Sequence, residues 1–165
     1  RVSNANHVKR SIRPIFDINM LSRELFKEKN YPFWLSLHSY YKGIKTILSR
    51  CSKDGNLYIV TGKDKASAEG LLSQINIQVN SDKVFHMNLS LNKLESLKKI
   101  ATIENVDYNK IHFLDDNVTH LKDPHENGFT VALGDWGYAL PEHIHRAKDY
   151  GIPVISKNQI LDFML

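Results

Sequence analysis

The chain has 165 residues, which is enough for one domain with a sizeable hydrophobic core. Hydrophobic residues make up 42% of the sequence and charged residues 24%, as in ordinary soluble globular proteins. The net charge is +4, but the basic residues are scattered among acidic ones, so the sequence does not favour a nucleic-acid partner.

No apolar stretch of the sequence approaches the length of a membrane span, and no signal-peptide pattern is present. The single cysteine, Cys51, has no partner for an internal disulfide, which is typical of a reducing compartment. We therefore expect a cytoplasmic protein without a membrane partner. Because the sequence begins at Arg1 and not at a methionine, we expect either processing or a segment upstream of it.

The first 40 residues are the least regular part of the sequence. Residues 1–13 are polar and basic, and a short apolar run around Asp17 follows them. Residues 21–29 have the apolar spacing of a short amphipathic helix, which we expect to end near Pro32 because proline disfavours helical geometry at the preceding residue. We treat residues 1–40 as an N-terminal segment and residues 41–165 as the core domain.

From Tyr41 onward, predicted helices and strands alternate. Apolar residues at helical spacing predict helices at 44–51, 68–75, 94–101, 141–150 and 160–164. Short apolar runs predict buried strands at 57–60, 84–87, 111–114, 129–133 and 153–155. This alternation predicts an α/β fold, a three-layer sandwich in which helices cover both faces of a mostly parallel sheet.

Two adjacent carboxylates, Asp115 and Asp116, directly follow the predicted strand 111–114. Ligands of open α/β sheets bind outside the carboxyl ends of the strands, where these side chains should lie. Neighbouring carboxylates repel each other unless a cation neutralises them, and oxygen ligands suit Mg²⁺. Asp115 and Asp116 are therefore candidate magnesium ligands. The alternative is that one of them only caps the helix or turn that follows.

Thr61 and Lys93 complete a set of residue types that phosphoryl transfer requires. Thr61 follows the predicted strand 57–60, and Lys93 opens the helix that contains Leu94. A hydroxyl and backbone N–H groups bond phosphate oxygens, an ammonium neutralises charge, and Mg²⁺ holds the remaining oxygens. Taken singly, Thr61 is more often a turn residue and Lys93 a solvated helix residue, but together with the carboxylates they predict a phosphate site.

These motifs resemble those of the haloacid-dehalogenase (HAD)-like hydrolases. The segment from Leu57 to Lys63 resembles the second motif of that family, Lys93 its third-motif lysine, and the segment from Phe113 to Asp116 its fourth, acidic motif. The segment from Gly128 to Tyr138 resembles the next strand and substrate-side loop of phosphoglycolate-phosphatase-like members. The resemblance implies a Rossmann-like hydrolase core that passes through an aspartyl-phosphate with Mg²⁺. It implies catalytic roles for Thr61 and Lys93, substrate binding by Thr61, Gly62 and Lys93, and metal binding by Asp115 and Asp116.

The first motif of the family, an apolar strand that ends in Asp-x-Asp, has one candidate here. Ile15-Phe16-Asp17-Ile18-Asn19 provides Asp17 as nucleophile, with Asn19 in place of the acid/base and with Arg13 and Pro14 just before it. Arginine and proline are unfavourable in a central strand. The other interpretation is that residues 1–40 belong to a helical cap and that the nucleophile strand lies upstream of Arg1.

The sequence leaves two functions open. The first is a Mg²⁺-dependent phosphatase that acts on a small phosphorylated metabolite through an aspartyl-phosphate. The alternative is a non-catalytic binding or scaffold domain of the same fold that lacks the nucleophile. The two differ in whether an Asp ends a strand between the strands of Thr61 and Asp115.

Overall fold

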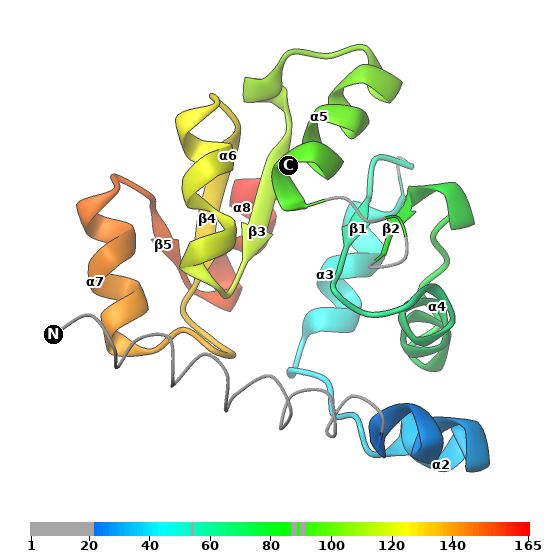
Figure 1. Ribbon diagram of the computed structural model, residues 1–165. Coiled ribbons are helices and arrows are strands. Elements are labelled where there is room, and N and C mark those ends of the chain that lie inside the picture. The colour runs from blue at the N-terminus through cyan, green and yellow to red at the C-terminus, as the bar shows by residue number, and fades with distance from the viewer. Residues whose placement is uncertain (1–21, 54, 87–88, 90–91) are drawn as a thin grey trace, which may run out of the picture. The chain divides into compact units, whose positions relative to one another are not determined.

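The computed structural model describes residues 22–53, 55–86, 89 and 92–165 of the chain. The chain divides into two compact units, Arg1–Tyr40 and Tyr41–Leu165. Helices and short parallel strands alternate in the second unit (Figure 1), so the α/β prediction is confirmed. None of the described helices has the length and apolar character needed to cross a membrane. Asp17 and the run around it lie outside the described residues.

The first unit contains two short helical segments. Residues 22–29 are helical, as the sequence predicts, and α2 (Tyr31–Ser36) follows at once. Asn30 caps α2 by accepting a hydrogen bond from the Phe33 N–H at 3.2 Å, and Pro32 lies in the first turn, where its missing N–H costs nothing. The sequence pattern did not predict α2, because Pro32 indicated only the end of the preceding helix.

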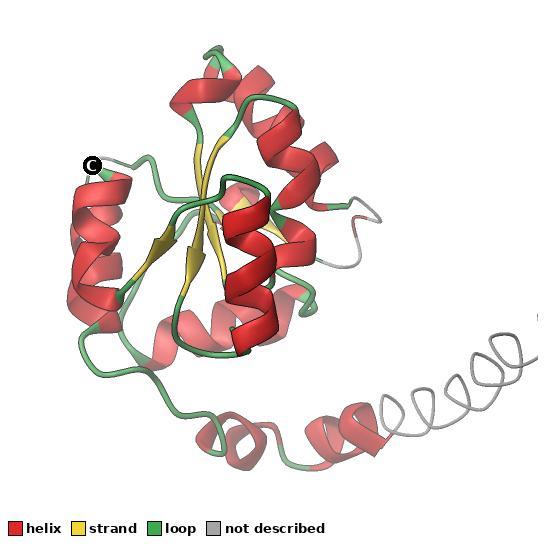
Figure 2. Cartoon of the chain, turned by 90° about the vertical axis from the view of Figure 1, so that its left-hand side faces the viewer, coloured by secondary structure: helices red, strands yellow, loops and turns green. Residues whose placement is uncertain are grey.

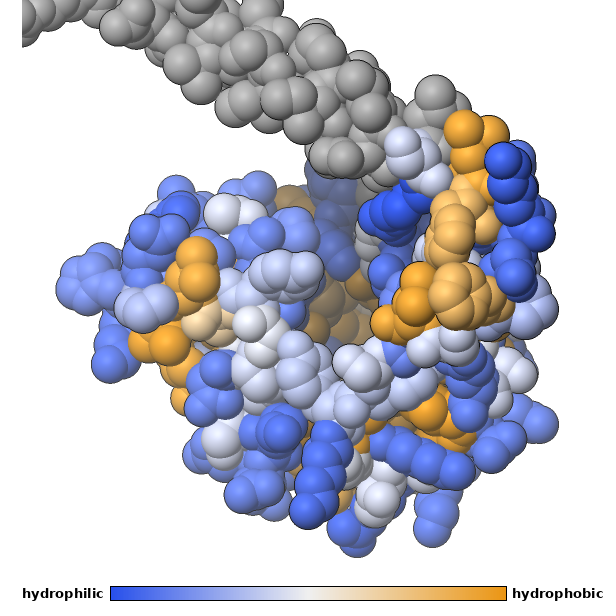
Figure 3. All heavy atoms as spheres, turned by 90° about the horizontal axis from the view of Figure 1, so that it is seen from below, coloured by the Kyte–Doolittle hydropathy of each residue, from blue (hydrophilic) through white to orange (hydrophobic). Residues whose placement is uncertain are grey.

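Large apolar side chains of this first unit are exposed, among them Leu25, Phe33 and Leu37. Figure 3 shows apolar side chains, coloured orange, on the surface of the molecule. Trp34 is buried, and the Tyr31 ring stacks on it with a centroid distance of 5.8 Å. The unit therefore places one aromatic side chain in a small core and leaves others in solvent.

The second unit contains the regular elements. Its strands are β1 (Ile59–Val60), β2 (Val84–Phe85), β3 (His112–Asp115), β4 (Thr130–Gly134) and β5 (Val154–Ile155). Its α-helices are α3 (Ile44–Cys51), α4 (Lys65–Gln74), α5 (Lys93–Glu104), α6 (Lys122–Glu126), α7 (Pro141–Asp149) and α8 (Ile160–Met164). Short 3₁₀ turns occupy Ser81–Lys83, Tyr108–Lys110, Val118–His120 and Lys157–Gln159.

The strands form two parallel sheets. β1 pairs with β2, and β3, β4 and β5 form a three-stranded sheet in that order. The prediction of one continuous sheet is therefore wrong for the described residues, although the parallel direction is confirmed. β1 and β3 are edge strands, and each has one edge that faces no strand partner within the described part of the chain.

The strand boundaries differ from the predicted ones. The predicted strand 57–60 is reduced to two residues, and Met87 of the predicted strand 84–87 lies outside the described residues. The third and fourth strands begin and end one residue later than predicted, so Asp115 is the last residue of β3. Leu57 is buried without strand pairing, because an apolar pattern reports burial and not hydrogen bonding.

Helices cover both faces of the three-stranded sheet (Figure 2). Along β4, Val131 and Leu133 belong to the larger core cluster, which includes Leu97 of α5 and Ala147 of α7. Ala132 belongs to a second cluster that contains residues of α3 and α8. Successive residues of a strand point to opposite faces, so β4 contributes to two cores at once. The β4 strand is thereby held between the two clusters.

Candidate functional site

Lys93 connects the carboxyl ends of β1 and β3. Its ammonium donates to the Val60 carbonyl at 2.5 Å and lies 3.7 Å from Asp115 Oδ2. Val60 is the last residue of β1 and directly precedes Thr61, whereas Asp115 ends β3. The structure therefore brings Lys93 and the predicted acidic pair together, with the Thr61 turn next to the lysine.

Lys93 reaches this position because α5 begins at it. Asn92 caps the helix with a capping box, in which its side chain accepts from the Glu95 N–H at 2.8 Å and Glu95 accepts from the Asn92 N–H at 3.0 Å. Helical side chains lean toward the N-terminus, so the first residue extends its side chain beyond the helix end. The ammonium also lies 5.9 Å from the centre of the Phe113 ring of β3.

The Lys93 ammonium is in a low-dielectric environment. Burial lowers the pKa of Lys93, and the nearby carboxylates of Asp115 and Asp116 oppose that shift. Only 19% of the Lys93 side chain and 12% of the Asp115 side chain are exposed, so water screens this ion pair less than a surface pair. The Lys93 ammonium is thus partly buried and is matched by one carboxylate and one carbonyl.

We expect Lys93 to titrate at lower pH than exposed lysines. Asp115→Asn should lower the Lys93 pKa further, because it removes a neighbouring charge that favours the protonated amine. Nitrogen-detected NMR of the lysine side chains measures both values without added metal. An unchanged Lys93 pKa in Asp115→Asn would contradict the electrostatic coupling. Asp149→Asn, at the far end of α7, is the control and should leave it unchanged.

Asp115 is held by three groups. The Asn117 N–H donates to Oδ1 at 2.9 Å, and His120 Nδ1 lies 3.1 Å from Oδ2 and 3.2 Å from Oδ1. A carboxylate only accepts hydrogen bonds, so the His120 Nδ1 carries a proton in this contact. Together with Lys93, these donors fix the carboxylate at the end of β3. Sequence reasoning missed His120, because a histidine five residues downstream in a 3₁₀ turn follows no periodic pattern.

Asp116 is held from the loop that follows β4. The Tyr138 N–H donates to Asp116 Oδ2 at 3.1 Å, which leaves Oδ1 outside that hydrogen bond. Gly137 has a φ of +84°, and a Cβ built on it would lie 2.3 Å from Asp116 Oδ2. The loop approaches the carboxylate this closely only because residue 137 is glycine. The sequence indicated a substrate-side loop here but no contact of Gly137.

Gly137→Ala should displace Asp116 and destabilise the protein. Gly128 is the matched control, because its φ is +88° and an added Cβ would meet nothing within 4 Å. We expect Gly128→Ala to cost about 1–2 kcal/mol of unfolding free energy from left-handed strain alone. Gly137→Ala should cost more, because the carboxylate must also move. Denaturant unfolding compares the two, and equal losses would show that the Gly137–Asp116 contact has no energetic consequence.

Thr61 lies in the turn between β1 and α4. Its backbone N–H pairs with the Phe85 carbonyl, and its Oγ1 accepts from the Lys63 N–H at 3.1 Å. Gly62 is exposed, and a Cβ on it would meet nothing within 4 Å. The hydroxyl is therefore turned into the loop that precedes α4, next to the strand end that Lys93 contacts. The hydrogen bond from Lys63 is typical of a threonine that stabilises a turn. The same position would also allow the Thr61 hydroxyl to contact a phosphate.

The carboxylate pair fits the requirement of a magnesium ion in number and kind. Mg²⁺ is commonly held by one or two carboxylates, with water and substrate phosphates completing the octahedron. Across residues 22–53, 55–86, 89 and 92–165, no cluster of three or more His, Cys, Asp or Glu side chains is placed to hold a metal ion. An ion here would therefore depend on water or phosphate oxygens for its other positions.

Comparison of this chain with protein-family models, with curated proteins and with solved structures gave no match.

Proposed function

We propose that this chain is a Mg²⁺-dependent phosphatase of small phosphorylated metabolites. The observation that supports this function is the position of Lys93, whose ammonium contacts the carboxyl end of β1 just before Thr61 and the carboxylate that ends β3. A hydroxyl, an ammonium and two carboxylates at one edge of parallel strands are the groups that phosphoryl transfer uses.

Each residue has a chemical role in the proposal. The Thr61 hydroxyl and the N–H groups of the turn that contains Gly62 bond the phosphate oxygens, and Lys93 neutralises their charge. Asp116 would hold the metal ion through Oδ1, and Asp115 would provide a second carboxylate at the end of β3. Bound Mg²⁺ supplies further neutralisation of the phosphate. Within this chain, Asp17 is the candidate nucleophile for the aspartyl-phosphate, and Asn19 stands in the sequence position of the acid/base.

The fold component of the proposal is a Rossmann-like core of the HAD type in residues 41–165. Its support is the order of the residues along the chain: hydroxyl, lysine and acidic pair, each at the carboxyl end of a strand or the start of a helix. A phosphate site at that edge agrees with the general placement of ligands in parallel sheets.

One observation favours a second function, a non-catalytic binding domain. Within the described part of the chain, β1 and β3 belong to separate sheets, and the described strands place no carboxylate between Thr61 and Asp115. A domain of this kind would bind phosphate or Mg²⁺ at the carboxyl ends of the strands without catalysing hydrolysis.

Hydrolysis of an aryl phosphate with Mg²⁺ separates the two functions. We expect hydrolysis by the wild-type chain, loss of it in Asp17→Asn, and a gain in Asn19→Asp, since a general acid contributes on the order of a hundredfold or more in rate. Hydrolysis that is unchanged in Asp17→Asn would remove Asp17 as nucleophile. No hydrolysis in any variant, with phosphate binding retained, would reject the phosphatase and support the binding domain.

A further inference from the structure

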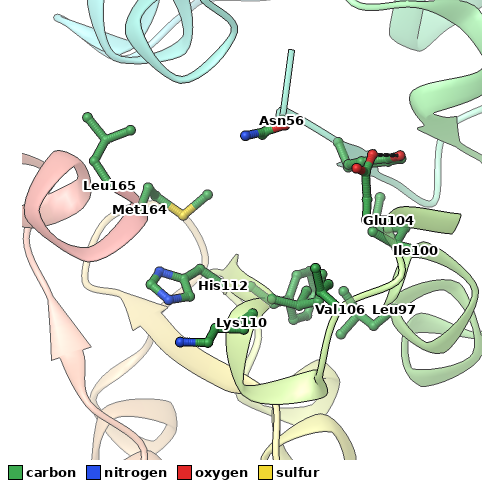
Figure 4. A pocket seen from close by; sticks show the side chains of 13 residues that line it. Asn56, Leu97, Ile100, Glu104, Val106, Lys110, His112, Met164 and Leu165 are labelled. Atoms are coloured by element: carbon green, nitrogen blue, oxygen red, sulfur yellow. Dashed lines mark hydrogen bonds between the residues drawn. The ribbon is translucent and has the colours of Figure 1, made fainter. Parts of the chain in front are cut away.

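A groove with a volume of about 380 Å³ separates the two sheets (Figure 4). Asn56 and Tyr58, next to β1, line one side of it, and Lys110 and His112, next to and within β3, line the opposite side. Figure 4 shows Asn56 across the open space from His112 and Lys110. The groove is thus bounded laterally by the edges of two strands.

The open edges of these strands carry backbone groups that are available for a ladder. The Thr61 N–H pairs with Phe85 of β2, and backbone groups alternate sides along a strand, so the Tyr58 and Val60 groups point away from β2. The Val60 carbonyl already accepts from Lys93, so the Val60 N–H and the Tyr58 groups are the ones available to a ladder. By the same alternation, the Ile111 carbonyl accepts from Thr130 next to β4, so the His112 and Leu114 groups point away from β4. Both sets of groups lie on the groove side.

β1 and β3 run in the same direction along the groove. Lys93 contacts Val60 and Asp115, which end the two strands, so their carboxyl ends are adjacent. Asn56 and Lys110, which precede the two strands, both line the groove at the other end. An extended segment between them would therefore pair with both neighbours in parallel.

The two remaining walls of the groove are apolar. Leu97 and Ile100 of α5 line one wall, and Met164 and Leu165 at the end of α8 line another (Figure 4). A strand in the groove would bury both of its faces, which is the situation of a central parallel strand. Such strands are continuous apolar runs and do not alternate with polar residues.

The charges at the end of the groove where β1 and β3 begin favour a particular first residue in a bound segment. Glu104 accepts hydrogen bonds from the Tyr58 hydroxyl and from Lys83, so its charge is matched. Lys110 is exposed and has no ion pair with any described residue. A segment that runs parallel to β3 places its first residue near this ammonium, where an acidic side chain is favoured.

We propose that the groove binds a partner polypeptide through an acidic residue followed by about four apolar residues, which add as a parallel strand between β1 and β3. A strand in the groove forms a hydrogen-bond ladder with each of its two neighbours, whereas a strand at the outer edge of β2 or β5 would form only one. Strand addition to sheet edges is a common mode of peptide recognition. The added strand would occupy the space between the strands of Thr61 and Asp115 that the nucleophile strand of a phosphatase requires, so this proposal rests on the second function, the non-catalytic binding domain.

A synthetic peptide with the central sequence Glu-Val-Ile-Val-Ile and lysine-containing flanks tests the proposal on the whole chain. We expect it to slow amide exchange of Tyr58, Val60, His112 and Leu114 by at least about tenfold, equivalent to about 1.4 kcal/mol. The amides of Val84 and Val154, on the outer edges of β2 and β5, should exchange as before. The same peptide N-methylated at alternate residues should not protect the groove amides, because it lacks the ladder donors.

Charge reversal tests the orientation of the peptide. Replacing the peptide Glu by Lys should weaken binding about two- to fivefold, as expected for an exposed ion pair, and Lys110→Glu should restore it. The proposal is overturned if the N-methylated peptide binds equally well, or if charge reversal at Lys110 has no effect. It is also overturned if the groove amides are already protected without peptide, whether by this chain or by a second copy detected in sedimentation.

Discussion

Lys93→Met should reduce kcat/KM for an aryl phosphate by about a hundred- to a thousandfold, the usual cost of removing one electrostatic contact to a developing anion. The ammonium lies 2.5 Å from the Val60 carbonyl and 3.7 Å from Asp115, in a position to reach a phosphate between these strand ends. Methionine keeps much of the apolar stem but removes the charge. Steady-state kinetics with Mg²⁺ measures the loss.

The fold should survive this substitution. Burial already disfavours the charged amine, and Asp115 retains the Asn117 N–H and His120 as partners. Lys99→Met is the matched control, because Lys99 lies on the exposed face of the same helix. Equal activity in Lys93→Met and Lys99→Met, with both proteins folded, would remove Lys93 from the site.

Leu133→Ala should lower the free energy of unfolding by about 2–5 kcal/mol, the range for deleting a buried leucine side chain. Leu133 of β4 is fully buried at 0% exposure and packs in the cluster that contains Leu97 and Ala147. The loss combines the transfer free energy of the removed atoms with the cavity left between sheet and helices.

Leu165→Ala is the control for this effect. Leu165 is 73% exposed, so its truncation should change stability by no more than about 0.5 kcal/mol. Denaturant unfolding followed by circular dichroism compares the two variants. Similar transition midpoints for both would show that β4 is not packed in the interior.

Sequence pattern predicted the parts of the fold that depend on burial and local signals. Apolar spacing located α5, and Asn92 with Glu95 three residues later explains why that helix begins at Lys93. It did not reveal that β1 and β3 belong to separate sheets, because pairing is a long-range property that no single segment encodes. It also missed α2, whose first turn accommodates the proline that was read as a stop.

The sequence predicted those parts of the candidate site that are formed by residues next to each other in the chain. Asp115 and Asp116 stand together in the sequence, and the alternation of strands and helices places them near Lys93. The contacts of His120 with Asp115 and of Gly137 with Asp116 come from different turns, so only the three-dimensional structure shows them. Such supporting residues are selected by geometry and leave no periodic signal.

Calorimetric titration of Mg²⁺ in the presence of inorganic phosphate tests most directly whether Asp116 and Asp115 form a metal-dependent phosphate site. We predict that the wild type and the control Asp149→Asn bind Mg²⁺ with the same affinity, and that Asp116→Asn binds at least about tenfold more weakly. Equal Mg²⁺ affinity in all three folded proteins would contradict the site.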